Sequence, residues 1–251
     1  MGDPTRASLL LCGDACRSEA YAALLAGERA DLLLTDPPYC LLTRRRKGGD
    51  LRDPKGRKID REPVVRFETV RDYRRFTAAW LPTAVRHVTS EALLIVWTNF
   101  LGKEPIVTEA RSLGFTHLWG EFVWAKRTTE SKGGEQLLRV YETALVLARR
   151  PPPAPTSADG PAAAAVVAGY DDDGEATRTG SHPHHKPFGV LEPLVRAYSR
   201  PGALILDPFG GSGSIAATAL RLERRVATLE LVPEWAARIE TRLGSAAVRD
   251  R

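Results

Sequence analysis

The 251-residue chain has few cysteines and no long apolar run. Its three cysteines, Cys12, Cys16 and Cys40, form no Cys-x-x-Cys pair, and their odd number argues against a disulfide framework. No stretch approaches the roughly 18 to 20 apolar residues that a membrane-spanning helix needs. The first residues also lack the basic start and apolar block of a secretory signal. These absences argue against a secreted disulfide scaffold and a membrane protein, and they favour a reduced, cytoplasmic compartment.

Positive charge is concentrated in one segment of the chain. The formal net charge is +5, yet nine Lys or Arg residues stand against three Asp residues between Arg44 and Arg61, so this segment alone carries +6. Residues 43–63 lack any periodicity and are rich in glycine and charge, which predicts a long mobile loop. Clustered positive charge is typical of contact with nucleic-acid phosphates, although a solvated loop with spare charge is the alternative. The predicted phosphate-binding residues are Arg44, Arg45, Arg46 and Lys47.

Short apolar segments alternate with amphipathic ones along most of the chain. Apolar runs closed by turn residues predict buried strands at Ser8–Cys12, Leu32–Thr35, Ala92–Trp97, Ala203–Leu206 and Val226–Leu229, and a hairpin of Glu121–Lys126 with Glu142–Ala148. Helical spacing predicts helices at Glu19–Ala26, Arg71–Val88, Glu104–Leu113, Phe188–Tyr198, Ser214–Leu222 and after Pro233. This alternation is typical of an α/β fold with a doubly wound, mostly parallel sheet. We predict a single domain over residues 1–251, with a low-complexity insertion at 150–181 for which no element is predicted.

A glycine-rich turn joins a predicted strand to a predicted helix, where residues 207–213 read Asp-Pro-Phe-Gly-Gly-Ser-Gly. Glycines allow the backbone to approach a ligand closely and place that ligand at the positive end of the helix. Glu230 ends the next strand, where a carboxylate can accept hydrogen bonds from ribose hydroxyls. A nicotinamide enzyme is an alternative, but the intervening Asp-Pro-Phe and the single strand and helix that follow disfavour it. A tight turn that merely needs glycine is a second alternative.

A second turn, Asp36-Pro37-Pro38-Tyr39, closes a strongly apolar strand. The two prolines remove backbone donors and stiffen the turn, so the Pro37 carbonyl and the Asp36 carboxylate can point at one spot. Two such acceptors suit the exocyclic amino group of a nucleobase, whose nitrogen becomes more tetrahedral and frees its lone pair for attack on a methyl sulfonium. Tyr39 offers a face on which an extruded base can stack. These four residues are the predicted catalytic set.

Together the two motifs resemble the amino-methyltransferases of DNA modification, which act on adenine N6 or cytosine N4. The resemblance covers the chain from Leu9 to about Leu243. It implies a Rossmann-like methyltransferase fold with seven strands, S-adenosylmethionine as methyl donor, double-stranded DNA as substrate and a flipped target base. The Asp-Pro-Pro-Tyr turn precedes the glycine turn here, which resembles the permuted subclass called beta. The implied activity is that of a site-specific DNA methyltransferase, with a homodimer and a cognate restriction nuclease left open as partners.

The resemblance also implies a set of cofactor-binding residues. Lys186 matches a cofactor-side motif within His184-His185-Lys186-Pro187, and Asp14 matches the residue that meets the cofactor's adenine. The full implied set is Asp14, Lys186, Asp207, Phe209, Gly211, Gly213 and Glu230. Two departures from the family stand out. Ser214 replaces the usual threonine, and the segment between Arg149 and Ser181, at the position of the target-recognition region, is short.

Several alternatives remain open. Asp36 favours adenine over cytosine, because cytosine-N4 enzymes of the resembled family tend to carry serine at that position. RNA is a further possible substrate, and a catalytically silent DNA-binding module is a rival from another class. That rival is disfavoured because Asp36, Tyr39, Lys186 and Glu230 are all retained. His182, His184 and His185 lack the further ligands of a tetrahedral zinc site, so no metal is predicted.

Overall fold

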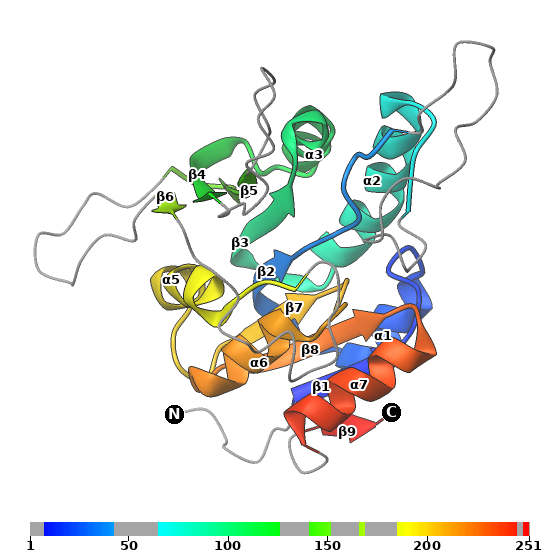
Figure 1. Cartoon of the computed structure of the whole chain (residues 1–251), viewed down its shortest axis with the longest axis vertical. Helices are drawn as coiled ribbons and strands as arrows, with labels where there is room; N and C mark the ends of the chain where they lie inside the picture. Colours follow the sequence, from blue (N-terminus) through cyan, green and yellow to red (C-terminus); the bar gives the residue numbers. More distant parts are fainter. Residues whose placement is uncertain are drawn as a thin grey trace, which may run out of the picture.

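The computed structural model describes residues 8–42, 65–125, 141–151, 166–168, 185–244 and 248–250 (Figure 1). The predicted loop 43–63, with Arg44, Arg45, Arg46 and Lys47, lies outside these residues. Leu42, which precedes the loop, forms a parallel bridge with Phe67. Most of the insertion 150–181 also lies outside them. Within the described ranges, no helix is both long enough and apolar enough to cross a bilayer.

One mixed sheet organises the described residues, in the order β6-β4-β5-β3-β2-β7-β8-β1-β9. Its body consists of seven strands: β1 (Ser8–Cys12), β2 (Ala30–Thr35), β3 (Val88–Thr98), β4 (His117–Ala125), β5 (Tyr141–Ala148), β7 (Leu204–Asp207) and β8 (Arg225–Glu230). Two three-residue strands extend the edges, β6 (Val166–Ala168) and β9 (Val248–Asp250). All neighbouring strands run parallel except β3 with β5 and β4 with β5. The predicted mostly parallel sheet and the β4–β5 hairpin pairing are confirmed.

Helices cover both faces of this sheet (Figure 1). The helices are α1 (Ser18–Leu25), α2 (Val70–Val85), α3 (Lys103–Ser112), α5 (Phe188–Tyr198), α6 (Ser214–Arg221) and α7 (Pro233–Leu243), with a short 3-10 turn η1 (Phe100–Gly102). Residues of α1, α2 and α3, such as Tyr21, Trp80 and Ile106, form one apolar core against the sheet. Residues of α5 and α6, such as Leu191 and Ile215, form the core on the opposite face. The sheet is therefore doubly wound, as predicted.

Two predictions about elements were wrong. The predicted helix Arg71–Val88 ends at Val85, and Val88 instead begins β3. The β-branched Val88 and Thr89 suit an extended strand, and they pair with β2 through the register Ala30 to Val88. The second error concerns residues 150–181, for which no structure was predicted. The short apolar run Val166–Ala168 within them pairs in parallel with β4.

The fold brings four strand ends to one edge of the sheet. Strands β2, β7, β8 and β1 are consecutive neighbours and all run parallel, so their carboxyl ends lie side by side. The chain continues from β2 to β3 on one side and from β7 to β8 on the other, which makes the β2–β7 boundary a topological switch point. Ligands of open α/β sheets bind in the crevice at such a point.

Candidate active site

A cavity of about 450 Å³ lies at this edge of the sheet. The segments after β2, β7, β8 and β1 contribute Asp36, the glycine turn, Glu230 and Asp14 in that order across the edge. Nine predicted site residues line it: Asp14, Asp36, Pro37, Pro38, Tyr39, Lys186, Phe209, Gly211 and Glu230. Asp207 and Gly213 do not line it. The four DNA-binding candidates Arg44, Arg45, Arg46 and Lys47 fall outside the described residues.

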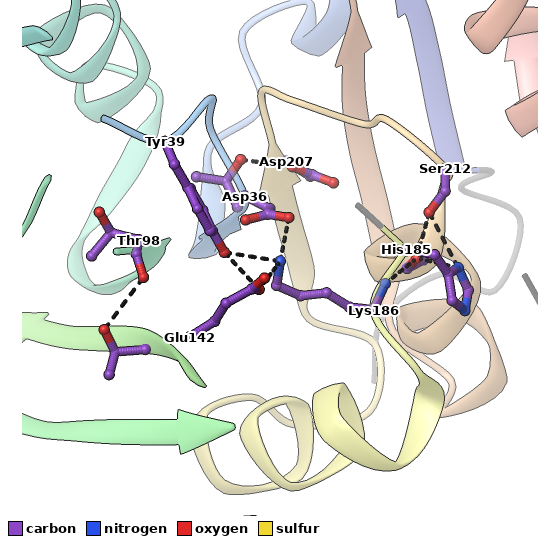
Figure 2. A network of polar contacts seen from close by, with 11 residues as sticks. Asp36, Tyr39, Thr98, Glu142, His185, Lys186, Asp207 and Ser212 are labelled. Carbon is purple, nitrogen blue, oxygen red and sulfur yellow. Dashed lines mark hydrogen bonds and ion pairs between the residues drawn. The ribbon is translucent and has the colours of Figure 1, made fainter. Parts of the chain in front are cut away.

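A compact cluster of charged and polar side chains surrounds Asp36 at one end of the cavity (Figure 2). The Lys186 ammonium donates a hydrogen bond to Asp36 Oδ2. The same ammonium lies 3.2 Å from Glu142 Oε2 and 3.2 Å from the Tyr39 hydroxyl. The Tyr39 hydroxyl in turn donates to Glu142 Oε2 at 2.8 Å. The exposed fractions of the charged side chains are only 3% for Lys186, 14% for Glu142 and 15% for Asp36.

The second oxygen of Asp36, Oδ1, is buried and accepts no hydrogen bond from the part of the chain that the structure describes. Buried carboxylate oxygens are nearly always partnered, because leaving one unsatisfied costs about 1–3 kcal/mol or more. Asp36 also lines the cavity. Its Oδ1 is therefore an unpaired acceptor on a side chain that lines the cavity.

Burial and charge set the protonation of this cluster. Burial lowers the pKa of Lys186, but the Asp36 and Glu142 carboxylates outweigh it and raise that pKa above its usual value. Burial, together with the same two carboxylates, raises the pKa of Tyr39 well above its usual value. Lys186 is therefore a cation and Tyr39 a neutral donor at neutral pH. Counted formally, two carboxylates and one ammonium give the cluster a charge of −1.

The glycine turn after β7 is held to the end of β8 by Glu230. Its Oε2 accepts from the Gly211 amide at 2.7 Å, and its Oε1 accepts from the Val232 amide at 2.9 Å. Gly211 has a φ of 51°, a conformation that favours glycine. At Gly210, an added Cβ would lie 2.5 Å from Thr228 Cγ2 and 2.8 Å from an atom of Ile239. The turn therefore needs glycine both for its conformation and for its close packing.

The rest of the cavity suits a ligand with a flat apolar ring and a polar sugar. Leu231, Val232, Trp235 and Phe209 line it with apolar surface, and the Glu230 carboxylate stands beside them. Leu231 is 65% exposed. The glycine turn lies at the N-terminus of α6, where backbone amides favour an anionic group. These features fit a nucleoside cofactor that also carries an amino-acid carboxylate.

Asp207 and Gly213 support the cavity from behind rather than lining it. Asp207 is fully buried, and its Oδ1 accepts from Thr35 Oγ1 at 2.7 Å and from the Phe209 amide at 3.2 Å. Burial raises the pKa of Asp207 to about 7. Gly213 has a φ of 73° and packs closely against Ile239, to which an added Cβ would approach within 3.2 Å. Both residues therefore position the glycine turn.

Two features of the site were missed or left aside in the sequence analysis. Glu142 was not predicted as a site residue, because it stands at the start of a strand and reads as a solvent-facing position. Ser212 and Ser214 line the cavity, and their hydroxyls lie 2.5 Å apart with His185 Nδ1 3.0 Å from Ser214 Oγ. Among the residues with assigned structure, no group of three or more His, Cys, Asp or Glu side chains is arranged to hold a metal ion.

The sheet order, the glycine turn after β7 and the Asp-Pro-Pro-Tyr turn after β2 together define a Rossmann-like methyltransferase. The family model of DNA methylases, N6_N4_Mtase, matches residues 30–240, and the chain belongs to this family. It is 28% identical over 232 residues to the provisionally named methylase YubD of Escherichia coli (strain K12), covering 91% of this chain and 86% of that protein.

Solved structures share the fold at low sequence identity. The M1.HpyAVI–SAM complex superposes with a TM-score of 0.66 at 16% identity, covering 94% of this chain and 98% of that one. The PvuII DNA methyltransferase, described as cytosine-N4-specific, gives a TM-score of 0.68 at 16% identity, with 96% and 87% coverage. The coverage on both sides shows that the shared fold extends over most of each chain.

Proposed function

We propose that this protein transfers a methyl group from S-adenosylmethionine to N6 of an adenine extruded from double-stranded DNA. The observation that carries the proposal is the buried Asp36 Oδ1, an acceptor without a partner among the described residues, on a side chain that lines a cavity suited to a nucleoside cofactor. The family membership of the chain supports DNA as the substrate.

The glycine turn, Glu230 and Asp14 would hold the cofactor, with Glu230 directed at the ribose and the apolar side chains of Leu231 and Val232 against the adenine ring. When bound, S-adenosylmethionine supplies a methyl group on a cationic sulfur, which departs as a neutral thioether with the electron pair of the broken carbon–sulfur bond. Ser212 and Ser214, at the N-terminus of α6, offer hydroxyl donors for the cofactor's carboxylate.

Asp36 would act on the target amino group. One N–H of that group donates to Asp36 Oδ1, and the Pro37 carbonyl accepts the other, as the sequence analysis predicts. Two such hydrogen bonds favour a tetrahedral nitrogen, whose lone pair then forms the new nitrogen–carbon bond. The nitrogen becomes cationic and releases one proton through Asp36 to water. The net negative charge of the cluster stabilises this developing positive charge.

Tyr39 would supply the stacking face for the extruded base. Its hydroxyl is fixed by Glu142 at 2.8 Å and by Lys186 at 3.2 Å, so the ring is held in one orientation at the cavity wall. Stacking of a base on such a ring contributes about 1–3 kcal/mol. The cost of extruding the base from the duplex is of a similar size, a few kcal/mol.

Adenine is the preferred base in this proposal because the acceptor is the carboxylate of Asp36. Cytosine N4 is the second candidate, since its amino group offers the same two donors and PvuII DNA methyltransferase, described as cytosine-N4-specific, shares the fold. The basic residues Arg44, Arg45, Arg46 and Lys47 follow Tyr39 closely in sequence, and we propose that they contact DNA phosphates.

Analysis of the methylated product tests this function. Double-stranded DNA lacking prior methylation is incubated with the protein and S-adenosylmethionine, digested to nucleosides and analysed by mass spectrometry. We expect N6-methyladenine. Finding N4-methylcytosine alone would contradict adenine as the target base but agree with the proposed methyl transfer. Unmodified nucleosides across DNA of varied sequence would contradict the proposed function.

A further inference from the structure

Glu142 occupies an unusual position for a glutamate. It lies on β5 directly opposite Trp124 of β4, and Ala144 and Val146 follow it at the alternate positions that share its face of the strand. Those two residues belong to the apolar core under α5 and α6. Glu142 is therefore the last member of an inward-facing row, with its carboxylate only 14% exposed.

A carboxylate at such a buried position lowers the stability of the fold unless neighbouring groups compensate its charge. Burying an ionised group is unfavourable by several kcal/mol or more unless it is paired and hydrogen-bonded. Two partners of Glu142 help to meet this cost, the Lys186 ammonium and the Tyr39 hydroxyl, which both contact its Oε2. Both partners also belong to the Asp36 cluster, so they link Glu142 to Asp36.

The charges of the cluster indicate what Glu142 contributes. A buried ammonium paired with Asp36 alone would cancel its charge and weaken Asp36 as an acceptor. Glu142 attracts the same ammonium. The Trp97 ring also packs against this ammonium, with its centroid 4.8 Å from Lys186 Nζ. In this low-dielectric setting, sharing one cation between two carboxylates leaves negative charge on Asp36.

We propose that Glu142 is a positioning residue for methyl transfer, which shares the Lys186 ammonium with Asp36 and holds the Tyr39 hydroxyl in place. Asp36 thereby keeps the negative charge with which it accepts the target amino group. Glu142 acts through Lys186 and Tyr39 and does not touch the substrate. This inference rests on the proposed function.

A double-mutant cycle tests it. Single-turnover rates of methyl transfer to DNA are measured for wild type, Glu142→Gln, Lys186→Gln and the double variant, along with KM for DNA, cofactor affinity and melting temperature. We expect Glu142→Gln to slow the single turnover about 10- to 100-fold, the loss typical of a hydrogen bond to a charged group. KM for DNA and the cofactor Kd should stay within about twofold.

The double variant should be no slower than the slower single variant, because Glu142 has no ammonium to share once Lys186 is gone. Glu142→Gln alone keeps the Lys186–Asp36 ion pair and so leaves neither of these two charges unpaired. The double variant leaves Asp36 without that ammonium, so its rate and melting temperature are compared with those of Lys186→Gln. The matched control is Glu121→Gln on the neighbouring strand β4, which removes a carboxylate paired at 2.5 Å with Lys103 of α3. It should turn over at the wild-type rate.

Three results would overturn the inference while leaving the proposed function standing: a wild-type rate in Glu142→Gln, losses that multiply in the double variant, or a rate loss fully matched by lost cofactor affinity. A wild-type protein that methylates no DNA would instead contradict the proposed function itself.

Discussion

Lys186 donates a hydrogen bond to Asp36 across 150 positions of sequence. The contact joins the segment that enters α5 to the turn that leaves β2, so the His-His-Lys-Pro segment and the Asp-Pro-Pro-Tyr turn meet in one ion pair. The resemblance to known enzymes placed Lys186 among the cofactor-binding residues. Its ammonium contacts Asp36, Glu142 and Tyr39, and its role in cofactor binding stays a prediction.

Replacing Gly211 with valine should lower cofactor affinity at least about tenfold. Gly211 lines the cavity with a φ of 51°, so a branched side chain there is strained and fills ligand space. Gly202→Val is the control, since Gly202 has a similar positive φ of 80° with no atom within 4 Å of an added Cβ. Isothermal titration with S-adenosylmethionine measures both. Equal affinity losses in the two variants would assign the effect to backbone strain alone.

Glu230→Ala should weaken cofactor binding by about 10- to 100-fold, as expected for hydrogen bonds to a charged group. The variant removes the proposed ribose acceptor and also frees the Gly211 amide from its 2.7 Å hydrogen bond. Glu240→Ala on the exposed side of α7 is the control and should bind normally. An unchanged cofactor affinity in Glu230→Ala would contradict the proposal that Glu230 binds the cofactor.

Asp207 should make folding less favourable as the pH rises. Burial raises its pKa in the folded protein to about 7, from an ordinary 3.8. In the folded state Asp207 keeps its proton to higher pH than in the unfolded state, so stability is full below about pH 4 and falls as the pH approaches 7. Between pH 5 and pH 8 the loss should be on the order of 3 kcal/mol.

Asp207→Asn isolates this contribution, because asparagine keeps an acceptor for Thr35 and carries no charge. Urea unfolding at pH 5 and pH 8 gives the stability of each protein. The difference in unfolding free energy between wild type and variant should change by about 3 kcal/mol between pH 5 and pH 8. The change favours the variant at pH 8. A gap that is the same at both pH values would show that Asp207 does not titrate in this range.

Neutralising Arg44, Arg45, Arg46 and Lys47 together should weaken the salt dependence of DNA binding. This prediction comes from the sequence, since these residues lie outside the described part of the chain. Each phosphate contact contributes roughly −0.9 to the slope of log affinity against log salt, so the slope should flatten by about two to four. Cofactor affinity should be unchanged. An unaltered slope would place the DNA-binding surface elsewhere.

Local patterns predicted most of the fold because each element carries its own signal. Helix α5 was predicted with its observed bounds, and β1 likewise, since apolar periodicity and flanking Gly or Pro mark their ends. The β6 strand was missed because three residues give no periodicity. Val88 was assigned to a helix because the pattern of α2 continues past its last turn.

The candidate site was predictable where a motif lies on contiguous residues, and less so where distant residues meet. Asp36, Tyr39 and Glu230 line the cavity as their motifs indicated. Glu142 joins them only because β5 runs antiparallel beside β3, a pairing that brings the start of β5 to the carboxyl edge of the sheet. Asp207 lies within its motif, yet it faces Thr35 beneath the cavity, a direction that sequence spacing does not specify.

Methyl transfer by Asp36→Ala tests the central claim most directly. Wild type and variant are incubated with unmethylated DNA and radiolabelled S-adenosylmethionine, and cofactor affinity is measured on the same preparations. We expect label in the DNA with wild type and none above background with Asp36→Ala, while both proteins bind the cofactor within about threefold. Label incorporated by Asp36→Ala at a rate near that of wild type would contradict the account, because the amino group would then be activated without the acceptor on which the mechanism depends.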